Sequence, residues 1–255
     1  MSLSDNFYKM LSGHEEDAAF QKDAAEMVLN ATESAERDGL LSLMYHEGIG
    51  VPVNLDRSFE YAEKAAFHGR DGLGYFMLGH MCDNAETPDQ AEGGPRQKYD
   101  HYDAERFYEI CSDIESRWKD LAILWLGDYY MDMAKGGDPE IAVEYYEKIA
   151  SHNAEAAGKL SDYYWDLVMP EYIEDEEWTS QLFKWTSVAA HLNPEKYSDR
   201  AKSIAKIFEE FLEDDLDAED RAECENNMMM WNERGDSLRE KGINEHIDKF
   251  DNTNN

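Results

Sequence analysis

Basic residues are scarce in this 255-residue sequence, which has 24 Lys and Arg against 57 Asp and Glu and a net charge of −33. A surface of that charge repels nucleic acid phosphates and anionic lipid headgroups, which argues against direct binding of DNA, RNA or a membrane. It attracts basic proteins and cations instead. Acidity also keeps a protein soluble, so solubility alone is an alternative explanation.

Other absences exclude further classes of protein. No run of about 18 apolar residues is present to span a membrane, and residues 1–20 lack the basic and apolar regions of a signal peptide. The three cysteines, Cys82, Cys111 and Cys224, are widely spaced, which fits reduced thiols in a cytoplasmic protein better than a disulfide framework. Strand patterns are also missing, because no alternating β-branched run or Asn-Gly hairpin occurs.

Motifs of common catalytic and ligand-binding sites are absent as well. His46 and Glu47 begin like a zinc-protease helix, but Gly50 stands where the H-E-x-x-H motif needs its second histidine. The segment GRDGLG (69–74) lacks the order of a nucleotide-binding loop, and DLDAED (215–220) lacks the glycine of a calcium loop. The eight histidines show no ligand spacing with Cys or Asp, and no G-x-S-x-G elbow occurs. The sequence therefore predicts a protein that is not an enzyme and has no cofactor or metal site.

Apolar residues at spacings of three and four are abundant, and this periodicity predicts helices. One helical motif, an aromatic face followed by small residues, recurs at 57–69, 103–113, 139–153 and 180–192. A second motif starts with Leu, continues with Gly or Ser, and recurs as LSLMY (41–45), LGHMC (78–82), LGDYY (126–130) and LSDYY (160–164). Tyr45 and Cys82 are separated by 37 residues, and Tyr130 and Tyr164 by 34. These are the lengths of helix-pair repeats.

The corner after the first of these motifs predicts how two helices are joined. Gly48 is expected to end the first helix as a left-handed C-cap, and Gly50 permits a second bend. Val51 is expected in the core, and Asn54 or Asp56 is expected to cap the next helix. The inward face of that helix is predicted to consist of Phe59, Ala62 and Ala66.

At these residues the chain resembles the Sel-one-like repeat (SLR) family of tetratricopeptide-like α-solenoids. The family pattern is roughly L-G-x-x-Y-x-x-G-x-G-V-x-x-D, followed by an alanine-rich helix that ends in A-A-x-x-G. The residues that match it in order are Leu41, Tyr45, Gly48, Gly50, Val51, Asp56, Ala65, Ala66 and Gly69. A later unit keeps Leu126, Gly127 and Tyr130, and the units after the first are degenerate within a resemblance that covers residues 35–192.

The repeats and the resemblance together predict an all-α fold, a right-handed superhelix (α-solenoid) of antiparallel helix pairs with terminal capping helices. We expect one continuous domain over residues 1–255. Its parts are an N-terminal capping helix at 14–36, about four repeats at 37–192, C-terminal helices at 193–241 and a tail at 242–255.

The resemblance implies a protein-interaction scaffold or adaptor, in a family that is often bacterial. Together with the charge, it leads to the hypothesis of a cytoplasmic adaptor that binds a basic protein or peptide through an acidic, aromatic surface. The alternative is an acidic inhibitor, of the immunity or nucleic-acid-mimic type, that blocks a basic nucleic-acid-binding or toxic protein. Some related secreted repeat proteins are linked to β-lactam hydrolysis, but this chain lacks their paired cysteines.

Candidate partner-binding residues come from acidic stretches and from tyrosine pairs. The corner EYIEDEEW (171–178) and the segment 209–225 concentrate carboxylates, with a solvated surface as the alternative interpretation. Adjacent helical residues point about 100° apart, and the repeat columns assign Tyr130, Tyr145 and Tyr164 to the core. The predicted partner-binding residues are therefore Tyr172, Glu174, Asp175, Glu176, Glu177, Trp178, Tyr129, Tyr146 and Tyr163.

Overall fold

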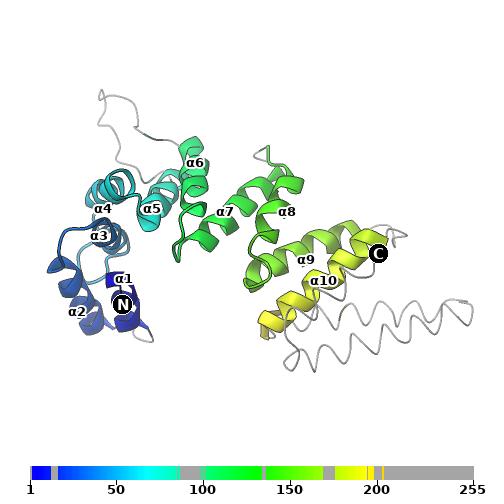
Figure 1. Ribbon diagram of the computed structural model, residues 1–255, viewed down its shortest axis with the longest axis horizontal. Coiled ribbons are helices and arrows are strands. Elements are labelled where there is room, and N and C mark those ends of the chain that lie inside the picture. Colours follow the sequence, from blue (N-terminus) through cyan, green and yellow to red (C-terminus); the bar gives the residue numbers. More distant parts are fainter. Residues whose placement is uncertain are drawn as a thin grey trace, which may run out of the picture. The chain divides into compact units, whose positions relative to one another are not determined.

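The computed structural model describes residues 2–12, 17–84, 86, 99, 101–133, 136–168, 176–193, 195–197 and 203. Throughout these residues the regular structure is helical and no strand occurs, so the predicted all-α fold is confirmed. The helices, shown in Figure 1, are α1 (Leu3–Leu11), α2 (Ala18–Leu29), α3 (Ala35–Glu47), α4 (Leu55–Glu63), the π-helix η1 (Lys64–His68), α5 (Gly72–Asp83), α6 (His101–Ser112), α7 (Lys119–Met131), α8 (Pro139–Glu147), α9 (Ala154–Val168) and α10 (Glu176–Leu192). Among them, none has both the length and the apolar character needed to cross a membrane.

The chain forms two compact units, Met1–Tyr129 and Tyr130–Asn255. In the first unit, α3 packs against α4, η1 and α5, and α5 packs against α6. In the second unit, α9 packs against α8 and lies antiparallel beside α10 (Figure 1). The expectation of one continuous domain stays a prediction. The C-terminal helices predicted at 193–241 lie almost entirely outside the described residues.

Two helices precede the first predicted repeat. α2 lies within 14–36, where a capping helix is predicted, and α1 precedes it in a stretch with no helix prediction. Ser2 and Asp5 form a capping box at the start of α1, and the Asp17 side chain caps α2. Both helices pack against α3, so they cover the end of the repeat array in the first unit.

The corner between α3 and α4 forms as its glycines predict. Gly48 is the C-cap of α3 with a φ of +75°, and Gly50 has a φ of +65°. Asn54, rather than Asp56, caps α4, because its side chain accepts a hydrogen bond from the Arg57 backbone N–H at 2.9 Å. A second corner, before α8, has Gly136 at φ +83°. Left-handed conformations of this kind favour glycine, which has no Cβ.

The core of the first repeat also follows the sequence pattern. The predicted inward face of α4 and η1 is buried, and so are the repeat positions on α3: Leu41, Tyr45, Phe59, Ala62, Ala65 and Ala66. Val51 is half-buried instead of fully buried. The neighbouring Pro52 and Val53 are exposed, which places this stretch at the rim of the core.

The small residue of the Leu-Gly/Ser motif lies at a contact between two helices at Ser42, Ser161 and Gly79. The buried Ser42 of α3 meets Ser58 of α4, whose hydroxyl donates to the Ser42 carbonyl at 2.9 Å. In the second unit, the hydroxyl oxygens of Ser161 and Thr186 lie 2.6 Å apart between α9 and α10. A Cβ added at Gly79 of α5 would lie 2.9 Å from the Tyr108 ring. The small side chain therefore lets neighbouring helices approach closely, as predicted.

The predicted assignment of Tyr145 to the core and Tyr146 to the surface is wrong. Tyr146 is 1% exposed, whereas Tyr145 is half-buried and stacks on Tyr130 with 5.7 Å between ring centroids. Buried positions on α8 are Ala142 and Tyr146, one helical turn apart, and Tyr145 is rotated about 100° from Tyr146. Tyr130 is half-buried as well. Tyr164, which is buried, agrees with its prediction.

The first repeat contains the same arrangement. Tyr61 stacks on Tyr45 with centroids 5.8 Å apart, and the Lys64 ammonium lies 5.1 Å from the Tyr61 centroid. In the second unit the Lys148 ammonium lies 4.0 Å from the Tyr145 centroid. Tyr61 and Tyr145 therefore occupy equivalent positions in the two repeats, and each precedes a fully buried residue, Ala62 or Tyr146.

Candidate functional site

The structure separates the nine predicted partner-binding residues into three groups. Tyr172, Glu174 and Asp175 lie outside the described residues, and so do the side chains of Glu176, Glu177 and Trp178 at the start of α10. Tyr146 is buried and cannot meet a partner. Tyr129 and Tyr163 are half-buried and keep part of their side chains at the surface.

Tyr129 belongs to a row of stacked rings in the first unit. Its ring lies 5.2 Å from that of Trp125, which in turn stacks on Tyr108 of α6 at 4.2 Å between centroids. The Trp125 indole N–H donates to the Asp83 carboxylate at 3.0 Å. Tyr108 is buried beneath this row, and burial raises the pKa of its hydroxyl.

A carboxylate accompanies these rings on α7. Asp128 is exposed and lies three residues after Trp125 and one before Tyr129. Residues at i, i+3 and i+4 share one face of a helix, so Trp125, Asp128 and Tyr129 are neighbours on α7. We call Asp83, Trp125, Asp128 and Tyr129 the Trp125 face. Sequence reasoning found Tyr129 and missed Trp125, although this helical spacing contains it.

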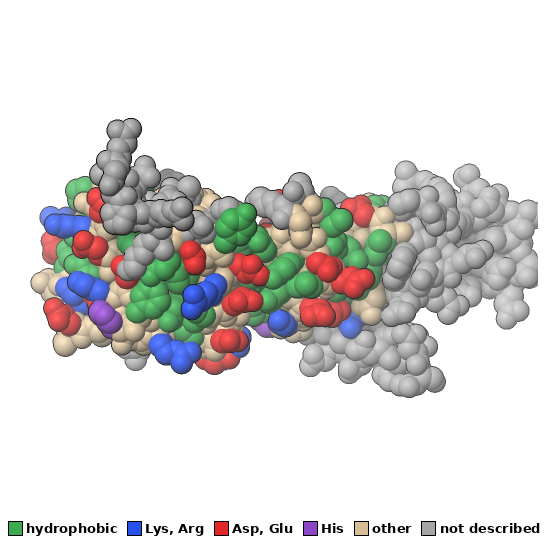
Figure 2. Space-filling model, turned by 90° about the horizontal axis from the view of Figure 1, so that it is seen from above, with side chains coloured by type: hydrophobic (Ala, Val, Ile, Leu, Met, Phe, Trp, Pro, Cys, Tyr) green, Lys and Arg blue, Asp and Glu red, His purple; other side chains and the backbone are tan. Residues whose placement is uncertain are grey.

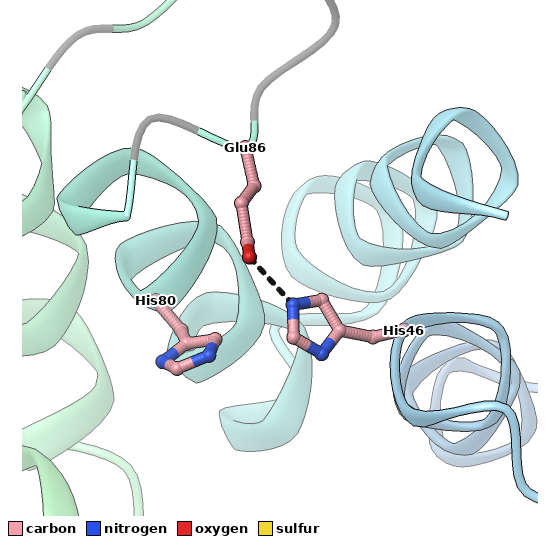
Figure 3. A group of neighbouring side chains, drawn as sticks. All are labelled: His46, His80 and Glu86. Atoms are coloured by element: carbon pink, nitrogen blue, oxygen red, sulfur yellow. Dashed lines mark hydrogen bonds and ion pairs between the residues drawn. The ribbon is translucent and has the colours of Figure 1, made fainter. Parts of the chain in front are cut away.

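A second cluster in the same unit contains His46, His80 and Glu86. His46 lies at the end of α3, His80 lies in the last two turns of α5, and Glu86 follows α5. One ligand atom from each of the three lies within 4.8 Å of the other two. Figure 3 shows the His80 and Glu86 side chains approaching His46, with Glu86 bound to His46 Nε2 at 2.7 Å.

The two ends of the His46 ring have different carboxylate partners. Nε2 meets Glu86, and Nδ1 meets Glu47 at 2.6 Å. Burial lowers the pKa of His46, but its hydrogen bonds to Glu86 and Glu47 outweigh burial and raise that pKa above the ordinary value. Burial lowers the pKa of His80, and the neighbouring His46 lowers it further. The pKa values of the two histidines are therefore shifted in opposite directions.

Sequence reasoning missed this cluster because no local motif contains it. His46 and His80 are 34 residues apart, the same separation as that of Tyr130 and Tyr164. Stacked repeats bring residues one repeat length apart into contact. The repeat length was therefore the pattern that could have predicted this pair. The prediction of no metal site came from ligand spacing along the sequence and did not consider pairs of residues one repeat length apart.

The two groups of residues are connected through α5, which contains both His80 and Asp83. The Phe76 ring of α5 stacks on His80, with centroids 6.5 Å apart, and meets Tyr108 edge-on at 5.4 Å. A chain of ring contacts thus leads from His46 through α5 to Trp125 and Tyr129. Figure 2 shows one face of the molecule, on which acidic side chains lie among apolar ones.

The fold and these corners define a helix-pair repeat protein. Residues 34–66 and 121–153 match the Sel1 repeat model, and these are the two segments with the tyrosine stacks described above. The chain therefore contains Sel1-like repeats, as the sequence resemblance predicted. Proteins with Sel1 repeats generally serve as protein-interaction scaffolds.

Two solved structures share this fold. A Sel1 repeat protein from Oxalobacter formigenes matches with a TM-score of 0.52 and 19% identity, over 93% of this chain and 87% of that one. A protective antigen of uropathogenic Escherichia coli with an SLR fold matches with a TM-score of 0.53 and 17% identity, over 91% of this chain and 44% of that one. No curated protein matches the chain. At these identities the likeness establishes the α-solenoid fold alone.

Proposed function

We propose that the protein is a non-enzymatic, cytoplasmic adaptor that binds a basic protein or peptide at the Trp125 face. The observation that carries the proposal is the half-buried Trp125–Tyr129 stack, held beside Asp83 in a chain of net charge −33. The buried thiols of Cys82 and Cys111 are in keeping with a reducing compartment.

The chemistry of the Trp125 face suits the side chains of Arg and Lys. A guanidinium or ammonium group is attracted to the face of an indole or phenol ring and to a neighbouring carboxylate. Asp83 and Asp128 supply carboxylates beside the two rings. The high negative charge of the chain also accelerates encounters with basic partners.

Trp125 is also held in place before any partner arrives. Its ring stacks on Tyr108 and on Tyr129, and its N–H is bound to Asp83. A side chain already fixed in one rotamer loses little conformational entropy on binding. Truncation of an aromatic hot-spot residue to alanine costs an interface about 2 kcal/mol or more.

The proposal is tested by selecting binders from a displayed library of random peptides on the full chain. We expect the selected peptides to be rich in Arg and Lys, and their affinity to fall at least ~30-fold for Trp125→Ala with Tyr129→Ala. Tyr102→Ala, at an aromatic residue that is 70% exposed on α6, is the matched control and should bind as the wild type does. Peptides without excess positive charge, or equal binding by the double variant, would contradict the proposal.

Salt dependence separates the adaptor from the acidic inhibitor. An adaptor anchored by aromatic rings keeps much of its affinity at moderate salt, because apolar contacts are not screened. A nucleic-acid mimic relies on a row of carboxylates, so its affinity falls steeply over the same range. Binding of the selected peptides is therefore measured in both low and high salt.

A further inference from the structure

We propose that His46, His80 and Glu86 form a binding site for a divalent first-row transition metal ion, with zinc as its representative, that ties α3 to α5. This inference concerns a different group of residues from the Trp125 face and does not depend on the proposed partner. The three residues come from one end of α3, from α5 and from the position just beyond α5.

The ligand atoms are nearly close enough for a tetrahedral ion. Zinc binds His nitrogen and carboxylate oxygen at roughly 2.0–2.2 Å, which puts two ligand atoms about 3.3 Å apart at a tetrahedral angle. Here the three atoms lie within 4.8 Å of one another, and His46 Nε2 and Glu86 are 2.7 Å apart. Separations of up to 4.8 Å exceed the tetrahedral distance by no more than about 1.5 Å, which side-chain movements can close. The Glu86 side chain is 33% exposed, which leaves it room to move.

Glu47 provides the outer support that a metal-binding histidine requires. Histidine ligands usually donate their second ring N–H to a carboxylate, which fixes the tautomer and the ring orientation. Glu47 already meets His46 Nδ1 at 2.6 Å, so Nε2 is the nitrogen left for the ion. The carboxylates of Glu47 and Glu86 together balance the charge of a divalent ion.

The donor set indicates the class of ion. Two imidazoles and one carboxylate suit zinc and its first-row neighbours, whereas magnesium and calcium prefer oxygen ligands alone. Three protein ligands leave one coordination position for water or another ligand. Without an ion, His46 Nε2 and Glu86 are hydrogen-bonded to each other at 2.7 Å.

The experiment titrates EDTA-treated full-length protein with ZnCl2 by calorimetry, with excess Mg²⁺ present to occupy the many surface carboxylates. We expect one zinc ion per chain at high affinity. His80→Ala and Glu86→Gln should each weaken zinc binding by at least ~10-fold, and Glu47→Gln by about 10- to 100-fold. His68→Ala changes an exposed histidine on η1 and is the matched control, with unchanged affinity expected.

Two results would overturn the proposal. One is a wild-type chain that binds no zinc beyond the level seen with His80→Ala. The other is unchanged binding in Glu86→Gln, which keeps the size of the side chain and removes its charge. Far-UV circular dichroism establishes that each variant is folded. Cobalt(II) provides a second readout, because a site of low coordination number gives intense visible absorption that the ligand variants should lose.

Discussion

The corner between α3 and α4 makes a quantitative prediction about Gly50. A Cβ at Gly50 would collide with the Gln21 carbonyl oxygen of α2 and would lie 2.6 Å from Ala25 Cβ. The φ of +65° is also unfavourable for any residue with a Cβ. Gly50→Ala therefore combines backbone strain with a clash against backbone that cannot rotate away.

Gly48 provides the matched control for the strain alone. Its φ of +75° is equally left-handed, but its added Cβ would meet the Val53 side chain at 3.0 Å. Val53 is 61% exposed and can turn away. Left-handed φ costs about 1 kcal/mol, and overpacking costs about 1–3 kcal/mol. We expect Gly48→Ala to lose about 1 kcal/mol of folding stability and Gly50→Ala about 2–4 kcal/mol.

Urea unfolding followed by circular dichroism measures both variants against the wild type. Alanine restricts the unfolded chain equally in the two variants, so the difference between them reports on the contact with α2. Equal losses for Gly48→Ala and Gly50→Ala would refute the close packing of the corner against α2.

Three other predictions follow from buried polar groups. Burial raises the pKa of Asp71 from 3.8 to about 6, so its ionised form destabilises the fold and stability falls as pH rises from 4 to 6. Asp71→Asn can keep the cap on the Gly74 backbone N–H. In thermal unfolding, this variant should be up to about 3 kcal/mol more stable than the wild type at pH 8 and similar to it at pH 4. Burial raises the pKa of Cys111 to about 12, and Cys82 is 2% exposed. Iodoacetamide should therefore label neither thiol in the native protein, as detected by mass spectrometry. Rapid labelling of either cysteine would contradict its burial. Ser161→Ala leaves the Thr186 hydroxyl buried without its partner and should cost about 1–3 kcal/mol in urea unfolding, whereas a second change, Thr186→Val, should recover most of that loss.

Local rules made the corner of the first repeat predictable. Gly48, Gly50 and Asn54 act through their own backbone conformation or through a cap three residues away, and neither depends on distant residues. Which face of a helix is buried, in contrast, depends on contacts with distant residues. Tyr145 and Tyr146 are both apolar enough for the core, and the packing of α8 against its neighbours selects Tyr146.

The candidate sites were less predictable because tertiary contacts assemble them. Asp83 meets Trp125 across 42 residues, and His46 meets Glu86 across 40. Charge alone predicts an acidic surface without indicating which carboxylates lie beside aromatic rings. The prediction of Tyr129 came from helical geometry within one pair of residues. Asp83 joins the same surface only through its hydrogen bond with Trp125 of α7.

Partner binding at the Trp125 face is tested most directly by comparing what wild-type and variant protein retain from a lysate of the native host. Tagged wild type, Tyr102→Ala and the double variant Trp125→Ala with Tyr129→Ala are each washed in low and then high salt. The proposed adaptor function predicts a basic protein that wild type and Tyr102→Ala retain through moderate salt and that the double variant loses. Retention of the same proteins by all three, or of no basic protein by any, would contradict it.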